Sequence, residues 1–152
     1  MIARALEFLG LHPEGVLATV SGGRPQTRVF QVMKIEHQTL FFATSPRKEV
    51  YSQLQADPHV EFLAMHGQVS VRCAGTVDWE VSPSTRLWIY SHNAVLSRLY
   101  SSADAMVYFR LPILRLDDYD LRPTPPVSLR FDLSTGQATA GYVGERFEEH
   151  QA

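Results

Sequence analysis

The sequence lacks the residues and spacings on which several common kinds of site depend. Cys73 is the only cysteine among 152 residues, so no intrachain disulfide can form. It lies in the apolar, strand-like run VSVRCAGTV, which indicates a small core residue rather than a reactive thiol. The six histidines show no HxH or HExxH spacing and no accompanying carboxylate cluster, so no metal site is expected. A Gly-x-Ser-x-Gly turn and a Cys/His pairing are also missing, and nucleophilic catalysis has no support.

The sequence also has no excess of one charge and no long apolar run. The formal net charge is −2, whereas nucleic-acid-binding domains usually carry a basic excess, so nucleic acid is a poor candidate partner and any anion site must be local. No apolar stretch approaches the roughly 20 residues that span a bilayer. The N-terminal stretch MIARALEFLGLHPEG lacks the apolar core and cleavage site of a signal peptide. We therefore expect a cytoplasmic protein that does not enter a membrane.

Length and composition predict one globular domain. The hydrophobic fraction of 45% and the charged fraction of 20% are ordinary for a soluble domain. A chain of this length buries about 70% of its unfolded surface, so it needs no disulfide or metal to hold a core together. We expect a single domain over residues 1–152, with a hairpin extension that begins at about residue 122.

Short strand-like runs joined by tight turns dominate the chain. Consecutive strands of this kind favour antiparallel pairing, and a mostly β chain with peripheral helices predicts a closed or split barrel. Pro112 predicts an edge position, a bulge or a break in its strand. The acidic run at residues 117–120 is interpreted as a solvated turn. Strands are expected at residues 15–20, 26–35, 39–44, 59–65, 68–79, 106–116, 127–133 and 137–143, and helices at residues 2–10, from about 46 to 56, and from 83 to about 101.

The segment ATSPRKEVYSQLQADP, residues 43–58, combines a predicted helix start with two cations. Thr44 or Ser45 is expected to cap the helix, and Pro46 fits its first position. Arg47 and Lys48 then fall in the first turn, where the helix dipole favours acidic residues.

An anion docked at this helix start would make the two cations favourable, and phosphate is the usual occupant of such a place. Thr44 and Ser45 would add hydroxyl donors, and Arg28 would reach the same place if the strand that carries it pairs with the strand at residues 39–44. The alternative is that Arg47 and Lys48 are solvated surface residues. The residues alone leave both interpretations open.

Three runs of the sequence carry a resemblance to a known family. The order GVLATVSGGRPQTRVFQV, TLFFATSPRKEVYSQLQADPHVEF and VRCAGTVDW resembles the flavin-binding split-barrel proteins of the pyridoxamine 5′-phosphate oxidase-like superfamily, and within it the small proteins grouped with nitroimidazole-resistance proteins. The resemblance covers residues 14–80 and extends more loosely through AVLSRLYSSAD at residues 94–104. It implies a mostly β, antiparallel split β-barrel of Greek-key type with flanking helices, a homodimer, and FMN bound at the subunit interface.

The resemblance also implies which residues contact the cofactor. The positions that match phosphate contacts are Arg28, Thr44, Ser45 and Lys48. The positions that match the stretch beside the isoalloxazine ring, largely through backbone groups, are Val29, Phe30 and Gln31. No catalytic side chain is implied.

The function implied is that of an FMN-dependent oxidoreductase that passes electrons from a reduced nicotinamide to a small acceptor. The alternatives are a flavin or haem carrier or sensor without turnover, with His66 or His92 as candidate haem ligands, and a barrel that serves only as a dimeric scaffold. A deazaflavin in place of FMN also stays open. True pyridoxamine 5′-phosphate oxidases end in a segment of the RLHDR kind, and RFDLSTGQATAGYVGERFEEH does not match it, so vitamin B6 oxidation is not expected.

Overall fold

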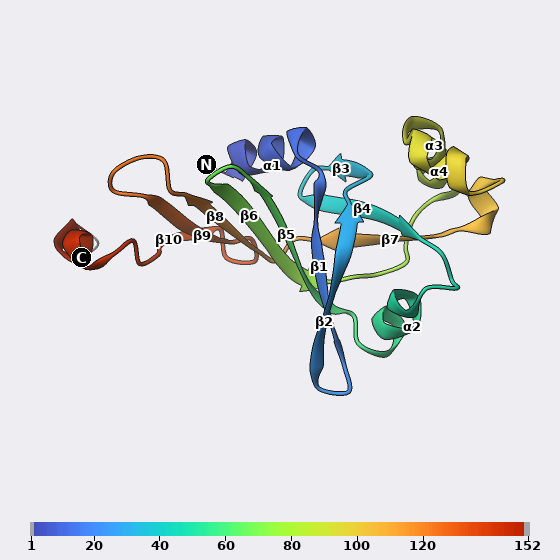
Figure 1. Ribbon diagram of the computed structural model, residues 1–152, viewed down its shortest axis with the longest axis horizontal. Helices are drawn as coiled ribbons and strands as arrows, with labels where there is room; N and C mark the ends of the chain where they lie inside the picture. The colour runs from blue at the N-terminus through green and yellow to red at the C-terminus, as the bar shows by residue number, and fades with distance from the viewer. Residues whose placement is uncertain (1, 151–152) are drawn as a thin grey trace.

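The computed structural model describes residues 2–150, which form two antiparallel sheets with helices at their periphery (Figure 1). None of the helices in this part of the chain is long and apolar enough to cross a membrane. The elements in chain order are α1 (Ile2–Leu11), β1 (Glu14–Ser21), β2 (Arg24–Gln31), β3 (Lys34–Glu36), β4 (Thr39–Thr44), α2 (Glu49–Ala56), β5 (His59–His66), β6 (Val69–Thr76), α3 (Pro83–His92), α4 (Ala94–Leu99), the short 3-10 helix η1 (Ala103–Ala105), β7 (Val107–Pro112), β8 (Arg115–Asp120), β9 (Val127–Asp132), β10 (Gln137–Ala140) and the 3-10 helix η2 (Glu145–His150).

The two sheets stay separate, which is the split-barrel arrangement that the sequence predicts. The larger has seven strands in the order β10-β9-β8-β6-β5-β1-β2, and the smaller has three in the order β3-β4-β7. Every pair of neighbouring strands is antiparallel. The prediction of a mostly β, antiparallel split barrel with flanking helices is therefore confirmed. In Figure 1 the β9–β10 hairpin lies at one end of the long axis and α3 and α4 lie at the other.

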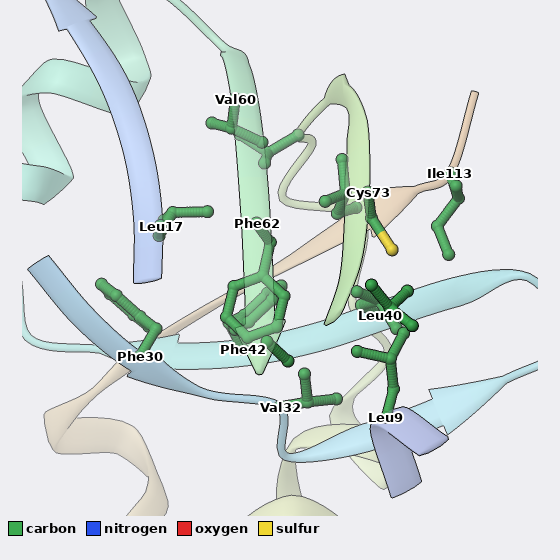
Figure 2. Packing of buried hydrophobic residues seen from close by; sticks show 14 of the residues in the cluster. Leu9, Leu17, Phe30, Val32, Leu40, Phe42, Val60, Phe62, Cys73 and Ile113 are labelled. Carbon is green, nitrogen blue, oxygen red and sulfur yellow. The ribbon is translucent and has the colours of Figure 1, made fainter. Parts of the chain in front are cut away.

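Phenylalanine side chains from both sheets fill the space between them (Figure 2). Phe42 is fully buried, and its ring centroid lies 5.2 Å from those of Phe62 and Phe109 and 5.9 Å from that of Phe30. Aromatic pairs at such spacings add to the free energy gained from burial alone. Leu9 from α1 joins the same cluster, so this helix completes the core.

Strand β4 is buried on both faces, which explains its continuous apolar run. Leu40 and Phe42 belong to the main core, whereas Phe41 and Ala43 belong to a second cluster beneath α3 and α4. Because side chains alternate along a strand, Thr44 continues the series of Leu40 and Phe42. A polar side chain is thereby carried into the end of the barrel.

Two strands predicted as continuous are interrupted where the chain passes from one sheet to the other. The expected strand at residues 26–35 ends at Gln31, where the backbone N–H of Val32 donates to Pro13 O (2.8 Å) and that of Met33 donates to Phe41 O (2.8 Å). The expected strand at residues 106–116 breaks after Pro112, one of the outcomes that this proline predicts.

The predicted start of α2 is wrong by three residues. The helix begins at Glu49 with Lys48 as its N-cap, and no side chain caps it. Pro46 and Arg47 instead form a turn, closed by the Lys48 N–H donating to Ser45 O at 3.1 Å. The first helical turn therefore carries the acidic residue that its dipole favours, and both cations precede it.

The next helical region is correctly predicted at its start and is divided farther along. Ser82 caps α3 by accepting from the Thr85 N–H at 3.2 Å, and Pro83 holds the first position. Asn93 then separates α3 from α4, and its side-chain amide donates to Ile89 O (2.8 Å) and Met33 O (3.3 Å). The expected single helix is two helices set over the small sheet.

The acidic run at residues 117–120 lies within β8, so its interpretation as a solvated turn is wrong. Strand register places Arg72 and Arg130 on either side of Asp117, which accepts hydrogen bonds from both at 2.8 and 2.7 Å. Asp120 is 4% exposed and accepts bonds from Arg122 at 2.8 and 2.9 Å. These carboxylates bind the strands of the large sheet and the loop that follows β8.

The Asp120 ion pair predicts a defined acid dependence of stability. Hydrogen bonds from the Arg122 side chain and backbone lower the pKa of Asp120 to about 2. Its contribution to the free energy of unfolding is thus present above the ordinary pKa and is lost as the pH falls through about 2. In urea unfolding, Asp120→Asn should be less stable than wild type by a constant amount above about pH 5, and the difference should shrink as the pH falls further. Asp104→Asn, an exposed control, should show no such trend; an unchanging Asp120→Asn difference down to pH 2 would contradict the prediction.

Candidate functional site

A pocket of about 550 Å³ opens between the edge strand β2, the end of β4, the start of α2, and α4. Six of the seven cofactor contacts predicted from the sequence line this one pocket: Arg28, Val29, Phe30, Gln31, Thr44 and Lys48. Ser45 is buried beside it but is not part of the lining, and its Oγ accepts from the backbone N–H of Arg47 at 3.2 Å. The arginine and the lysine come from separate segments, as the phosphate hypothesis requires.

The hydroxyl of Thr44 is the most informative atom of this pocket. The residue is 2% exposed, and its Oγ1 has no hydrogen-bond partner within the described part of the chain. Buried polar atoms are nearly always partnered, and an exception calls for an explanation such as a bound group. A phosphate oxygen in the pocket would supply the missing partner, so the residues present fit such a group.

Arg28 is held firmly at the wall of the pocket. Nη1 donates to Thr19 Oγ1 (2.8 Å) and Leu17 O (3.2 Å), and Nη2 donates to Gln53 Oε1 (2.6 Å). The Nε–H and the second Nη2–H have no acceptor among the described residues and are free for a ligand. Partial burial lowers the pKa of Arg28 from its ordinary value, and the nearby Glu49 carboxylate partly opposes this. The guanidinium remains a cation.

The start of α2 adds a second positive element. Lys48, Glu49 and Val50 all line the pocket, so the first N–H groups of the helix adjoin it. Free N–H groups at a helix N-terminus favour anions, and an exposed lysine contributes a mobile point charge. This end of the pocket therefore suits a dianion more than a neutral group.

The other end of the pocket is apolar and suits a flat ring. β2 is the last strand of its sheet, so one edge of its backbone has no partner strand among the described residues. Its Val29 is 75% exposed at the rim. The remaining apolar lining at this end is supplied by Phe30, Met33, Ala43, Val95, Leu96, Leu99, Tyr100 and Met106.

Of the four aromatic side chains at residues 79–100 (Trp79, Trp88, Tyr90 and Tyr100), Tyr100 alone lines the pocket. Trp79 packs in the core, with its ring centroid 5.3 Å from that of Tyr51 and 5.5 Å from that of Phe109. Trp88 stacks on His92 at 4.1 Å, outside the pocket lining. Trp79 therefore belongs to the core, whereas Trp88 is exposed, with Lys34 Nζ 3.9 Å from its ring centroid.

Cys73 and the candidate haem ligands His66 and His92 lie outside the pocket lining. Cys73 is fully buried, and burial raises the pKa of its thiol to about 12, in agreement with the predicted core role. His66 stacks on His12 with ring centroids 3.9 Å apart, and neither His66 nor His92 lines the pocket. No group of three or more metal-ligating side chains occurs in residues 2–150.

Sequence reasoning missed the residues that hold Arg28 in place and most of the apolar lining. Thr19 and Gln53 lie far from Arg28 in sequence, and no motif links them to it. The lining residues from α4 fall within AVLSRLYSSAD, the segment of looser family resemblance. That resemblance is the sequence feature that could have identified them.

Together, the fold and the pocket define a split-barrel protein with a pocket that is cationic and hydroxyl-bearing at one end and apolar at the other. The family model for pyridoxamine 5′-phosphate oxidase matches residues 1–101. The chain belongs to this family, and the resemblance seen in the sequence is confirmed.

Several solved structures share the fold. A pyridoxamine 5′-phosphate oxidase-related, FMN binding protein from Nostoc punctiforme PCC 73102 is 18% identical, with a TM-score of 0.71 over 94% of this chain and 95% of that one. A NimC/NimA family protein from Clostridium acetobutylicum is 20% identical, with a TM-score of 0.68 over 85% and 91%. A heme binding protein from Mycobacterium smegmatis is 17% identical, with a TM-score of 0.59 over 70% and 48%. No curated protein is similar enough in sequence to count as a match.

Replacement by valine should change the free energy of unfolding differently at two buried threonines, Thr44 and Thr19, because only the Thr19 hydroxyl has partners among the described residues. Thr44→Val removes no hydrogen bond seen among the described residues, so the free energy of unfolding should stay unchanged or rise by up to about 1 kcal/mol. Thr19→Val removes the bonds to Arg28 and Gln53 and should lower it by about 1–2 kcal/mol. Urea unfolding of the ligand-free protein measures both. Equal losses in the two variants would show that the Thr44 hydroxyl is structural.

Proposed function

We propose that this pocket binds FMN. Its phosphate would accept hydrogen bonds from Thr44 and the free N–H groups of Arg28, with Lys48 adding charge, and its ring would lie along residues 29–31 against α4. The observation that carries the proposal is the buried, unpartnered Thr44 hydroxyl in a pocket that two cations also line. Family membership and an FMN-binding relative of the same fold support it. Ser45 stays a predicted contact beside this group.

FMN fits the pocket better than haem does. Two cations and a helix start suit a phosphate dianion, whereas haem needs an axial ligand, and none of the described lining residues is a histidine. The haem-binding relative shares the fold only, at 17% identity. An absorption spectrum of the protein incubated with each cofactor distinguishes the two through flavin bands or a Soret band.

We further propose an oxidoreductase that passes electrons from a reduced nicotinamide to a small acceptor, with a carrier or sensor without turnover as the alternative. Bound FMN supplies the redox chemistry, and the chain supplies its orientation and electrostatics. A reduced nicotinamide also fits the cytoplasmic location that we propose. Bleaching of the flavin bands by NADH or NADPH, followed by recovery with an acceptor, separates turnover from a carrier role.

Oxidation of vitamin B6 is not part of this proposal. The family match covers residues 1–101, and the chain beyond it includes the hairpin of β9 and β10. This hairpin extends the large sheet at the edge opposite β2, the strand that lines the pocket. The C-terminal segment of the B6 oxidases has no counterpart at the pocket in the part of the chain that the structure describes.

We propose a homodimer formed through the outer face of the large sheet. Strand register sets Val29, Val16 and Leu63 side by side across three strands, with exposed fractions of 75%, 38% and 42%. Because Val29 also lines the rim of the pocket, a second copy on this face would bury the apolar row and reach the ring end of the cofactor. The site would then be completed by both chains.

Loss of either cation should weaken FMN far more than riboflavin, which has no phosphate. Lys48→Ala should lower FMN affinity about tenfold to a hundredfold, because a charge-assisted contact contributes about 1.5–3 kcal/mol. Arg28→Ala should do at least as much, since it also releases Thr19 and Gln53. Titrations of flavin fluorescence measure both ligands.

Arg47→Ala is the matched control, because this cation is next to Lys48 in sequence, is exposed and is not part of the lining. Its FMN affinity should equal that of wild type. Unchanged FMN affinity in Lys48→Ala and Arg28→Ala would refute the assignment of the pocket.

If the chain dimerises through this face, one surface substitution should halve the mass of the particle in solution. Val16→Lys places a charge at the centre of the apolar row and should convert a dimer into a monomer in sedimentation equilibrium. Leu87→Lys alters an exposed leucine of α3, outside this sheet face, and should leave the mass unchanged. A monomeric wild type at high concentration and with FMN bound would overturn the proposal.

A further inference from the structure

The side chain of Gln53 is the hub of the network that holds Arg28. Its Oε1 accepts from Arg28 Nη2 at 2.6 Å and from Thr19 Oγ1 at 2.9 Å, while Thr19 Oγ1 itself accepts from Arg28 Nη1 at 2.8 Å. A guanidinium only donates, so the oxygen of the Gln53 amide must be the atom that faces it. The three side chains form a closed triangle of hydrogen bonds.

This triangle joins the elements that bring the two cations to the pocket. Gln53 lies on α2, the helix that begins directly after Lys48, whereas Thr19 and Arg28 lie on β1 and β2. Thr19 is 1% exposed, which makes it a rigid point of attachment in the barrel wall. Moving α2 relative to β2 would break the bond at Gln53, so the same contact sets the spacing of Arg28 and Lys48.

The neutrality of Gln53 matters as much as its geometry. A carboxylate at this position would accept the same hydrogen bonds but would form an ion pair with Arg28 and cancel the charge offered to a phosphate. The nearby carboxylate, Glu49, acts on Arg28 through its field, without a hydrogen bond between them among those of the described residues. Arg28 is therefore fixed by neutral acceptors.

We propose that Gln53 is a positioning residue that aims Arg28 at the cofactor phosphate while leaving its charge uncompensated. The inference rests on the proposed binding of FMN. It extends the binding site to a side chain that the pocket lining does not include. If Gln53 only braced Arg28, a charged acceptor would serve at this position as well as a neutral one. Replacing the amide by a carboxylate therefore separates bracing from preservation of the Arg28 charge.

The test compares Gln53→Glu with wild type for FMN and for riboflavin. Gln53→Glu keeps the acceptor, so its unfolding midpoint in urea should match that of wild type or exceed it. Its FMN affinity should fall by about tenfold or more, because the cation next to the phosphate is neutralised, and its riboflavin affinity should stay the same. Gln53→Leu, which removes the acceptor, should lose both stability and FMN affinity.

Gln55→Glu is the matched control, since it adds the same charge to an exposed position of the same helix. Its affinity for both flavins should equal that of wild type. If wild type prefers FMN to riboflavin and Gln53→Glu binds FMN as wild type does, Gln53 is only a brace and the inference fails while the proposed function stands. If wild type shows no preference for FMN over riboflavin, the phosphate site itself fails, and the inference fails with it.

Discussion

The burial of β4 on both faces is the constraint on which the pocket depends. Its alternate side chains enter two separate cores, and neither the register nor the direction of the strand can change without exposing one set. Thr44 is the last residue of this strand, so its hydroxyl is fixed by packing that has nothing to do with its own bonding. Packing of β4 thus holds at the end of the barrel a hydroxyl that has no hydrogen-bond partner among residues 2–150.

The positive charge of the pocket comes from two elements next to β4 in the structure. Arg28 reaches the pocket from β2, and Lys48 reaches it from the turn before α2, so two cations share a space without an acidic side chain hydrogen-bonded to Arg28 in the described part. Partial burial makes this costly for Arg28, as the lowered pKa of its guanidinium shows. A phosphate would offset the burial of the Arg28 charge and would give the Thr44 hydroxyl a partner. The two features together support a bound ester more than either feature alone.

The sequence predicts those parts of the fold that depend on local pattern. Residues adjacent in sequence determine the apolar run of β4, the hairpin of β1 and β2, and the helix start at Ser82-Pro83. The predicted bounds of β4 match the structure. The missed features depend on contacts distant in sequence. The break at Val32 follows from its bond to Pro13, and the character of Asp117 follows from arginines on two other strands.

The observed start of α2 removes one reason to expect an anion site, but it leaves Lys48 at the pocket. Arg47 and Lys48 suggest an anion site because the sequence predicts them in the first turn of a helix, whose dipole repels cations, yet the helix begins after them. Lys48 still lines the pocket, because the preceding turn directs the chain there, while Arg47 stays exposed and outside it. The helix dipole treats both cations alike, whereas the family resemblance selects Lys48 and the tertiary structure places Lys48, but not Arg47, at the pocket. The guanidinium of Arg28 and the hydroxyl of Thr44 reach the same pocket from strands of separate sheets, although these two strands do not pair. They are therefore a sounder basis for the proposed phosphate site than the helix start.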